Sequence, residues 1–425
     1  MARQGELIRD ALVATGYEFV QLEPRMSDVK SSWRPDVVAW AADVGGTLVP
    51  WAAVENKKSS VAIQPEVILS ALARARDLLG TVDHYVVVNG DEWYLADPGL
   101  QRLARVDGPE APPYGGEGEI ADVDLVTNLL AEHLWRAASR SRHSAAPLTA
   151  PPFDPEAALD FKGFRTLSNV WIPIRKDALW QGRRRAVVEF ARRGREAGMF
   201  TSQRAIAVAV AQLVGAKLDE DVLDPFCGTG SFLWEAIEYA REHGTGLRTV
   251  LGYDINERMI EVAGSIGESA PLPVEIVRGD ALEIDLLSAK AVISAPPFGL
   301  RLQGQVELLG GTTTRDGDLA IIDRLVRALG DGGRAVLHLP VGVTFRSTGE
   351  DYRHFLASNF RIDAIIGLPQ GAVPGISIRS VLMVIDRAAP NDTFVAQLGE
   401  DWEAQLAPGG PAMEAALQHL DGNHA

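Results

Sequence analysis

The chain has 425 residues, of which 46% are hydrophobic and 23% are charged, so it is long enough for two folded domains and too hydrophobic to be disordered. Its formal charge is -16, with 41 Lys and Arg against 57 Asp and Glu, which argues against a protein coated by nucleic acid but allows one basic groove. The single cysteine, Cys227, excludes an internal disulfide.

The start of the chain, MARQGELIRD, lacks the hydrophobic core of a signal peptide. The most hydrophobic stretch, residues 205–216, is about half as long as a membrane span requires. We therefore expect a soluble cytoplasmic protein that makes no contact with a membrane.

Residues 1–107 are expected to form an α/β domain with the order helix, strand, strand, strand, helix, strand. Hydrophobic spacing in 6–16 predicts the first helix, and the Val- and Trp-rich runs at 34–43 and 48–58 predict two strands. The second helix, at 65–80, precedes a Val-rich strand that ends at an Asn-Gly turn. This helix is expected to bury one face, made of Val67, Ile68, Ala71, Leu72 and Ala75.

Two carboxylates stand on neighbouring predicted strands of this domain. Asp36 follows Pro35, and Glu55 precedes Lys57 by two residues, so the last two side chains point to the same face of one strand. Mg²⁺ takes one or two carboxylates and completes its shell with water and phosphate. The lysine beside them would orient the attacking water. The plainer alternative is a solvated edge strand on which Glu55, Lys57 and Lys58 have no function.

These residues and the order of elements resemble the core of the PD-(D/E)xK nucleases. The resemblance implies a restriction-endonuclease-like domain in which Asp36 and Glu55 are the metal ligands and, with Lys57, the catalytic residues of a Mg²⁺-dependent endonuclease. It also points to Glu6 on the first helix, and less strongly to Gln64, as auxiliary ligands.

Residues 108–165 are expected to be a linker and a helical segment, because 108–119 is rich in Pro and Gly and the helical pattern that follows contains a loop of helix breakers. The stretch 175–204 carries nine basic residues against three acidic ones. It precedes the next domain on an acidic chain and is a candidate surface for DNA phosphates, although most charge runs are solvated helix faces.

From residue 166 to 390 helices and strands alternate, as in a doubly wound α/β sheet. The most informative stretch is VLDPFCGTGSF, where a strand ends at Asp224 and a turn of small residues leads into a helix. Gly228 and Gly230 in this turn allow a ligand to approach the backbone closely. The sequence contains no GxxxxGK[ST] pattern, which excludes a familiar NTP-driven motor.

Three further strand ends carry residues with a chemical role. GYDIN ends a strand with Asp254, an acidic residue placed to bind ribose hydroxyls. GDAL places Asp280 after a third strand, and SAPPFG at 294–299 follows a fourth. The last motif forms a rigid lip with an aromatic face.

In this order, DPFCGTGSF, GYDIN, GDAL and PPF resemble the amino-N6 DNA adenine methyltransferases, especially the modification subunits of type I restriction systems. The resemblance covers about residues 160–387. It implies a seven-stranded, Rossmann-like sheet that binds S-adenosylmethionine, within an α/β chain that also carries the restriction-endonuclease-like domain. The implied site residues are, for the cofactor, Thr201, Asp224, Phe226, Gly228, Gly230, Asp254 and Asp280, and, for catalysis, Pro296, Pro297 and Phe298.

The resemblance also gives these residues roles. The turn at 224–230 cradles the methionine end of the cofactor, Asp254 holds the ribose and Asp280 meets the adenine amino group. Thr201 caps the pocket, and Phe298 stacks on a flipped base.

The chain departs from the family at one position. The family motif is Asn or Asp, then Pro-Pro and an aromatic residue, whereas this chain has Ala295. In the family, the first side chain and a neighbouring backbone carbonyl accept the two hydrogens of adenine N6 and localise its lone pair. Losing one such contact in a transition state costs roughly 3–4 kcal/mol, or about a hundred- to a thousandfold in rate. The domain is therefore either a slow methyltransferase or one that keeps the fold and the cofactor without transfer.

Together, the two resemblances predict a restriction-modification or antiphage-defence protein that combines a DNA adenine-N6 methyltransferase-like domain with a Mg²⁺-dependent endonuclease-like domain. The expected partners are DNA and a specificity or other defence subunit, because 391–425 reads as a short tail, too short for a target-recognition domain. The rival interpretation is a catalytically degenerate methyltransferase-fold subunit that binds or senses DNA. A third, methyl transfer to RNA or protein, would need a different partner surface.

Overall fold

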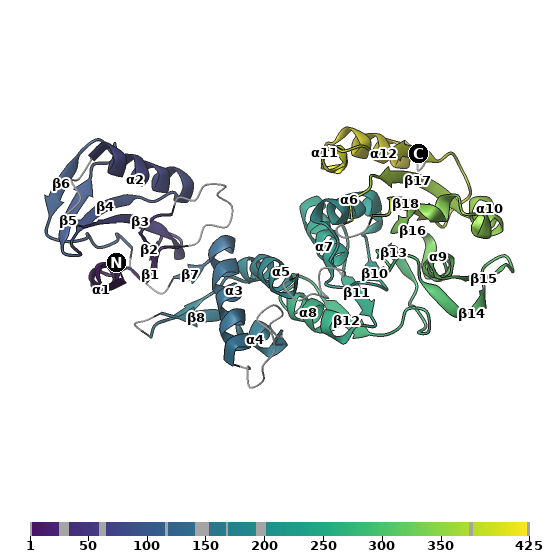
Figure 1. Cartoon of the computed structure of the whole chain (residues 1–425), viewed down its shortest axis with the longest axis horizontal. Coiled ribbons are helices and arrows are strands. Elements are labelled where there is room, and N and C mark those ends of the chain that lie inside the picture. The colour runs from purple at the N-terminus through teal and green to yellow at the C-terminus, as the bar shows by residue number, and fades with distance from the viewer. Residues whose placement is uncertain are drawn as a thin grey trace. The chain divides into compact units, whose positions relative to one another are not determined.

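The computed structural model describes residues 2–24, 34–58, 65–114, 118–140, 153–166, 169–192, 201–373 and 377–422. The chain divides into two compact units (Figure 1). The first consists of Met1–Ala137 and Glu156–Ala186, and the second of Ala138–Pro155 and Val187–Ala425. The segment expected as a linker and helical region, 108–165, is thus divided between the units.

The first unit is built on one mixed sheet. Its described strands are β1 (Phe19–Leu22), β2 (Val37–Ala42), β3 (Thr47–Lys57), β4 (Asp83–Val88), β5 (Glu92–Ala96), β6 (Leu103–Val106) and β7 (Glu119–Ile120). They follow the order β1-β2-β3-β4-β5-β6, and β7 pairs with β3. Paired strands are antiparallel, except that β3 is parallel to β4 and to β7. The expected order up to β4 is confirmed, while β5 and β6 extend the sheet beyond what the sequence indicated.

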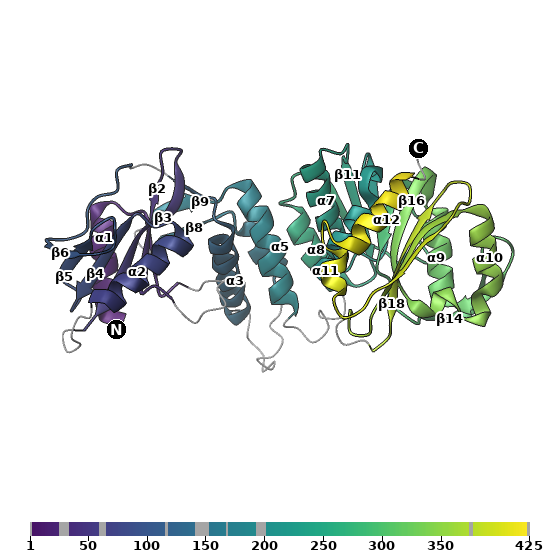
Figure 2. The same cartoon turned by 90° about the horizontal axis from the view of Figure 1, so that it is seen from above.

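Helices α1 (Ala2–Thr15) and α2 (Pro65–Leu79) cover opposite faces of this sheet (Figure 2). Leu12 of α1 packs on the face that carries Val54, and Leu72 of α2 packs on the face that carries Ala53. Helix α2 connects the parallel strands β3 and β4, because a parallel pair needs a crossover connection of this length. The result is a three-layer α/β/α arrangement.

The expected buried face of α2 needs one correction. Val67 is 62% exposed, and Leu69 is buried instead, beside Ile68, Leu72 and Ala75. These four buried positions follow the i, i+1, i+4, i+7 spacing of a single helix stripe, and residue 67 lies beyond its edge.

Along the sequence, β7 is followed by α3 (Val123–Arg140), α4 (Pro155–Asp160), β8 (Gly163–Arg165), β9 (Trp171–Pro173) and α5 (Lys176–Arg192). The hairpin of β8 and β9 interrupts a region in which the sequence indicated helices only. Within the first unit, an ion pair of 2.8 Å joins Asp124 of α3 to Arg185 of α5. Gly182 of α5 lies against Val126 of α3. A side chain at position 182 would overlap Val126, so the two helices pack closely at this point.

The second unit is built on a sheet of eight described strands. They are β10 (Asp221–Asp224), β11 (Thr249–Asp254), β12 (Val274–Arg278), β13 (Ala289–Ser294), β16 (Leu329–Pro340), β17 (Arg361–Leu368), β18 (Ser380–Asp386) and β19 (Phe394–Gln397). Their order is β12-β11-β10-β13-β16-β18-β17-β19, in which β18 is antiparallel to both neighbours and the other pairs are parallel. This is the expected doubly wound α/β sheet. The expected number of seven strands is corrected to eight, because β19 adds an edge strand beside β17.

Helices cover both faces of this sheet. They are α6 (Arg204–Val214), α7 (Ser231–His243), α8 (Glu257–Gly267), α9 (Gly317–Arg327), α10 (Glu350–Asn359), α11 (Trp402–Leu406) and α12 (Pro411–Gly422). Figure 2 shows α9 and α10 on one side of the sheet and α7, α8 and α12 on the other. A separate hairpin, β14 (Arg301–Glu307) and β15 (Thr313–Asp316), lies next to α9.

The segment 391–425, expected to be a tail, is mostly folded in the structure. It forms β19, α11 and α12, and the side chains of Trp402, Met413 and Leu420 are buried. The spacing of hydrophobic residues along α12 is that of an amphipathic helix, which explains why it packs on the unit.

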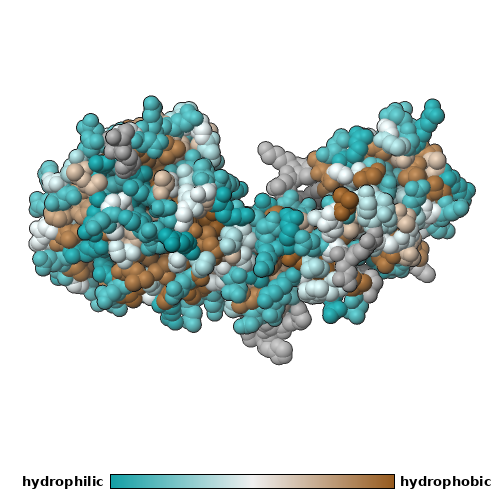
Figure 3. Space-filling model, turned by 180° about the vertical axis from the view of Figure 1, so that it is seen from behind, coloured by the Kyte–Doolittle hydropathy of each residue, from teal (hydrophilic) through white to brown (hydrophobic). Residues whose placement is uncertain are grey.

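None of the described helices is long and hydrophobic enough to cross a membrane. On the face shown in Figure 3, hydrophilic and hydrophobic residues are interspersed.

Candidate functional site

The strand order of the second unit reverses at β10 and β13, where ligands of doubly wound sheets bind at the carboxyl ends of the strands. Asp224 ends β10, Asp254 ends β11 and Ser294 ends β13. Ser294 Oγ donates a hydrogen bond of 3.0 Å to Asp224 Oδ1, which joins the two central strand ends. The structure therefore brings the Gly-rich turn and the Pro-Pro-Phe lip to one edge of the sheet.

The Gly-rich turn between β10 and α7 has backbone conformations that favour glycine. Gly228 and Gly230 have φ angles of +54° and +82°, in the left-handed region. A side chain at position 230 would overlap the ring of Trp234, whose Nε1 donates a hydrogen bond of 2.8 Å to the carbonyl of Thr229. The turn thus depends on both glycines and is held by the first turn of α7.

Asp224 is almost completely buried, with 2% of its surface exposed. It accepts hydrogen bonds from Ser294 and, at 3.1 Å, from the backbone N–H of Phe226, whose ring packs toward the hydrophobic core. Burial raises the pKa of Asp224 to about 7. Near neutral pH this carboxyl group therefore exists in both the neutral and the charged form.

Asp254 fastens the turn to the end of β11. Its Oδ2 accepts a hydrogen bond of 2.9 Å from Gly228 N, and its Oδ1 accepts one of 2.8 Å from Asn256 N. Burial raises the pKa of Asp254 despite these two donors. The carboxylate expected to hold a ribose is thus also a structural part of the turn.

The two remaining polar candidates lie beside these strand ends. Gly279 N donates a hydrogen bond of 3.0 Å to Asp254 O, which places Asp280 next to the end of β11. Asp280 Oδ1 accepts a hydrogen bond of 2.9 Å from Leu282 N. Thr201 Oγ1 lies 3.4 Å from Thr229 Oγ1, so Thr201 reaches the Gly-rich turn from the segment before α6.

The lip after β13 presents a supported aromatic ring. Pro296 is buried and Pro297 is exposed. Phe298 packs edge-on against His338, with ring centroids 5.5 Å apart. Burial lowers the pKa of His338 to about 4, so its ring is neutral, and its Nε2 lies 2.9 Å from Ser380 Oγ. Phe298 therefore packs against a hydrogen-bonded, uncharged imidazole ring.

Sequence reasoning missed the residues that hold the far end of the lip. Asp318 is 2% exposed, accepts a hydrogen bond of 2.8 Å from Gly299 N and pairs with Arg346 Nη2 at 2.5 Å. Arg346 also pairs with Asp316, the residue that caps the N-terminus of α9. The available signal was a pair of acidic residues at the start of a predicted helix, which by itself indicates only a helix cap.

In the first unit, β2 and β3 bring the three nuclease candidates together. Val37 faces Val54 across the two strands, so Asp36 lies beside Glu55. Lys57 Nζ is 2.5 Å from Glu55 Oε2 and 3.6 Å from Asp36 Oδ2. The two carboxylates thus converge on one ammonium group.

Burial raises the pKa of Glu55, although the hydrogen bond from Lys57 opposes this shift. For Lys57, burial lowers the pKa, but the carboxylates of Glu55 and Asp36 outweigh burial and keep the pKa above its usual value. The expectation that these residues could stand on a solvated edge strand is wrong, because β3 lies between β2 and β4 and Glu55 is 7% exposed. A catalytic role of Glu55 and Lys57 stays a prediction.

The auxiliary ligands expected for this site are not brought to it. Glu6 is exposed on α1, which packs on the face of Val54, and side chains alternate along β3, so Glu55 points to the opposite face. Gln64 lies outside the described residues. The described part of the chain contains no group of three or more His, Cys, Asp or Glu side chains that suits a metal ion.

Most described arginines of the basic stretch form hydrogen bonds or ion pairs within the first unit. Arg183 is 1% exposed and donates a hydrogen bond of 3.1 Å to the carbonyl of Leu159. Arg185 pairs with Asp124, and Arg175 forms two hydrogen bonds with its near neighbour at position 177. Residues 193–200 lie outside the described part. A DNA-binding surface at 175–204 therefore stays a prediction, with fewer charges available than the sequence indicated.

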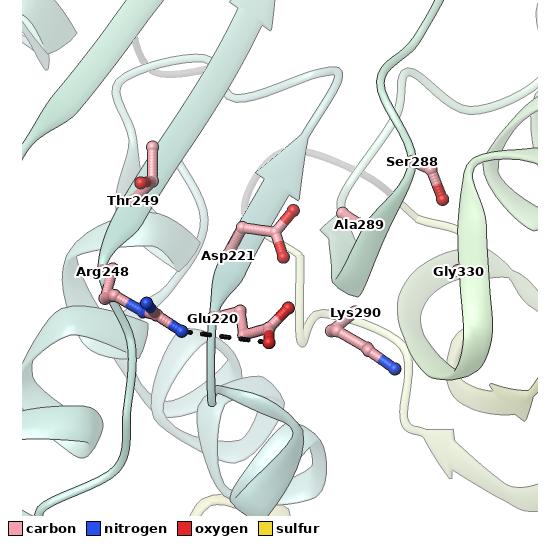
Figure 4. Close-up of a pocket in the computed structure, with 8 residues that line it drawn as sticks. All are labelled: Glu220, Asp221, Arg248, Thr249, Ser288, Ala289, Lys290 and Gly330. Carbon is pink, nitrogen blue, oxygen red and sulfur yellow. Dashed lines mark ion pairs between the residues drawn. The ribbon is translucent and has the colours of Figure 1, made fainter.

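A polar hollow of about 510 Å³ opens at the other edge of the second sheet (Figure 4). Its lining includes Asp221, Thr249 and Ala289, the first residues of β10, β11 and β13. Opposite charges meet there, with Arg248 3.9 Å from Glu220. The hollow therefore lies at the amino ends of the strands, away from the carboxyl ends that carry the candidate site.

The comparison with protein families decides the class of the second unit. Residues 187–402, about half of the chain, match the model of the family described as N-6 DNA methylase. The chain belongs to the N-6 DNA methylase family. The match starts where the second unit resumes and lies entirely within it.

Individual relatives are more distant. The chain is 24% identical over 212 residues to the EcoEI type I restriction enzyme methylase subunit of Escherichia coli, which covers 46% of this chain and 43% of that protein. It is 34% identical over 97 residues to a tRNA (guanine(10)-N2)-dimethyltransferase of Methanothermobacter thermautotrophicus, covering 22% and 27%. A type I restriction-modification methyltransferase subunit from Streptococcus thermophilus aligns at 18% identity and a TM-score of 0.46, covering 57% and 58%. The chain spans less than half the length of the curated type I subunits it matches.

Proposed function

We propose that the second unit binds S-adenosylmethionine and methylates adenine N6 in DNA, and that Ala295 makes this transfer slow. The observation that supports the proposal most is the convergence of Asp224, Asp254 and Ser294 on the Gly-rich turn, beside the Pro-Pro-Phe lip. Membership of the N-6 DNA methylase family supports the same reaction class.

The residues at this edge suit S-adenosylmethionine. The left-handed glycines let the turn pass close to the carboxyl ends of the strands, which is the place where doubly wound sheets bind their ligands. In this proposal Asp224 and the turn receive the methionine end, Asp254 accepts from the ribose hydroxyls and Asp280 from the adenine amino group. Thr201 closes the pocket from the side of α6. When bound, the cofactor supplies an electrophilic methyl group.

The lip holds the target base in this proposal. Phe298, supported by His338, stacks on an adenine that has been turned out of the duplex. A backbone carbonyl of the lip accepts one hydrogen of the adenine amino group, whereas Ala295 offers no side-chain acceptor for the other. The nitrogen lone pair is then only partly localised, which accounts for slow transfer.

Binding of the methyl donor tests the proposed pocket. Asp254→Ala should weaken S-adenosylmethionine binding at least about tenfold, because it removes charged acceptors and releases the N–H of Gly228. Titration calorimetry on the full chain measures this, and Asp285→Ala, an exposed carboxylate beyond β12, is the matched control. Absence of binding by the wild type at high micromolar donor would overturn the pocket.

We propose a second activity, Mg²⁺-dependent cleavage of a phosphodiester bond, for the first unit. The convergence of Asp36 and Glu55 on Lys57 favours it, because two carboxylates about one cation form a site that Mg²⁺, water and a phosphate can share. Lys57 would then turn toward the water or the developing phosphate charge. Asp36 and Glu55 would hold the metal, which would supply an activated water when bound.

A plasmid-nicking assay with Mg²⁺ tests the second activity. Glu55→Ala and Lys57→Ala should each abolish nicking, whereas Lys58→Ala should not, because Lys58 is exposed and lies one residue beyond the end of β3. The assay is run with and without proteins encoded nearby, since a partner can supply sequence choice. Nicking that survives both substitutions places the active site elsewhere.

The biological setting that fits both activities is restriction-modification or antiphage defence, with DNA and a specificity subunit as partners. The rival role is a DNA-binding sensor that keeps the fold and the cofactor without chemistry, and Ala295 is the observation that favours it. Donor binding with neither methyl transfer nor nicking under any partner condition selects the sensor.

A further inference from the structure

A polar hairpin follows the Pro-Pro-Phe lip directly. We call residues 301–316, which contain β14 and β15, the strap. Its root is fixed, because Gly317 N donates a hydrogen bond of 2.8 Å to Leu300 O and Asp318 holds Gly299 N. A side chain at position 317 would overlap Leu300, so the two chain segments approach as closely as glycine allows.

The turn of the strap is fixed as well. Leu308 is 2% exposed and belongs to the core formed with α9 and α10. Leu309 N donates a hydrogen bond of 2.7 Å to Asp323 Oδ1, and Tyr352 Oη donates one of 3.0 Å to the same oxygen. Because both ends are held, the strap keeps its shape without a ligand, which lowers the entropic cost of a contact.

One face of the strap points outward. Glu307 pairs with Thr313 across the hairpin, and the next residue, Thr314, is buried. Side chains alternate along β15, so Arg315 lies on the exposed face of Thr313. The register of the hairpin shifts between Arg301 and Val306, so Gln305 is assigned to the outward face by its exposure, like Glu307. The outward face therefore carries an amide, a guanidinium and a carboxylate.

Gln305 and Arg315 are both exposed, and within the described part of the chain no hydrogen bond or ion pair involves either side chain. Arginine binds phosphate oxygens, and a glutamine amide can both donate to and accept from a base edge. A two-stranded ribbon also fits the major groove of B-DNA. These groups stand on a rigid support whose root is three residues from Phe298.

We propose that the outward face of the strap contacts the DNA next to the target base, with Arg315 at a phosphate and Gln305 at a base edge. This inference rests on the proposed function, because it requires that the lip receives its base from DNA. Glu307 lies toward the turn of the strap, farther from the lip, and repels the same phosphate backbone.

The test uses the full chain, S-adenosylmethionine and a fluorescent DNA duplex, with affinity read from anisotropy. Arg315→Ala should weaken binding about tenfold and reduce the slope of log affinity against log salt by about one. Gln305→Ala should weaken binding about threefold, and Glu307→Gln should strengthen it about threefold. The matched control is Arg248→Ala, which removes a positive charge at the amino ends of the strands. Melting curves and donor affinity should be unchanged in all four variants, because these side chains are exposed.

Two results would overturn the inference while leaving the proposed function in place. One is wild-type DNA binding that Arg315→Ala does not weaken, or weakens no more than Arg248→Ala does. The other is Glu307→Gln and Arg315→Ala shifting affinity in the same direction. Failure of the wild type to bind duplex DNA, or preferential binding of an RNA hairpin run in parallel, would overturn both proposals.

Discussion

At the scale of single residues, the lip of this protein combines an intact support with one missing acceptor. Ser294 is tied to Asp224, and Phe298 rests on His338, so the position of the lip does not depend on the side chain of residue 295. In the proposed reaction, Ala295 therefore changes the chemistry offered to the base while leaving the lip in place.

Asp224 makes stability depend on pH in a direction that can be measured. An unfolded Asp side chain has a pKa near 4, whereas burial raises the folded pKa of Asp224 to about 7. Between these values the native state holds a proton that the unfolded state has released, so the contribution to stability falls as pH rises from about 4 to about 7. Asp224→Asn should remove this loss and keep the hydrogen bonds from Ser294 and Phe226.

The variant should therefore be more stable than the wild type at pH 8, by on the order of a few kcal/mol, with the gap closing toward pH 4. Urea unfolding of the second unit, followed by pulse proteolysis at several pH values, measures the difference. A gap that is constant with pH would contradict the assigned shift. Donor binding should weaken in the same variant, because the methionine ammonium loses a negative partner.

Some contacts between single residues could be predicted from the sequence, and others could not. Asp36, Glu55 and Lys57 meet because alternation along adjacent strands is a local rule, visible in the sequence. The contact of Asp318 with Gly299 and Arg346 joins segments that only the fold brings together, and no local pattern marks it. A charge count along the basic stretch also could not show that one of its members, Arg183, is buried.

At the scale of elements, the sequence predicted the strands that are followed by a recognisable motif. It did not predict short strands that lack such a motif. Strands β10 to β13 each end in a recognisable turn or acidic residue, and all are present. The hairpin of β8 and β9 has strands of three residues, too short to give a period. Strand β19 and helix α12 lie in the stretch 391–425, which the sequence indicated only as a short acidic tail.

Helix α12 is expected to contribute to the stability of the second unit. Met413 is fully buried, so Met413→Ala should lower the free energy of unfolding by about 2–5 kcal/mol. Glu414→Ala, an exposed change on the same helix, should have an effect within about 0.5 kcal/mol. Pulse proteolysis in urea, scored on fragments of the second unit, compares them. Equal midpoints for Met413→Ala and the wild type would show that α12 is dispensable.

At the scale of the whole molecule, the two units differ in what identifies them. The family match and the specific motifs all fall in the second unit, where the fold, the Gly-rich turn and the lip all indicate the same family. In the first unit, the side chains of Asp36, Glu55 and Lys57 converge on an α/β sheet. The motif that they form is short, so the nuclease proposal depends on this geometry. The net charge of -16 concerns the molecule as a whole and does not give the charge of any single face.

We propose that this chain has a DNA adenine methyltransferase site slowed by Ala295. The most direct test is transfer of labelled methyl groups from S-adenosylmethionine to duplex DNA by the wild type and by Ala295→Asn, with the modified base identified after digestion. We expect slow formation of N6-methyladenine by the wild type and a rate about a hundredfold higher in the variant, because asparagine restores an acceptor for the amino group. Rapid methylation by the wild type, or no methylation by Ala295→Asn when donor and DNA are both bound, would contradict the account.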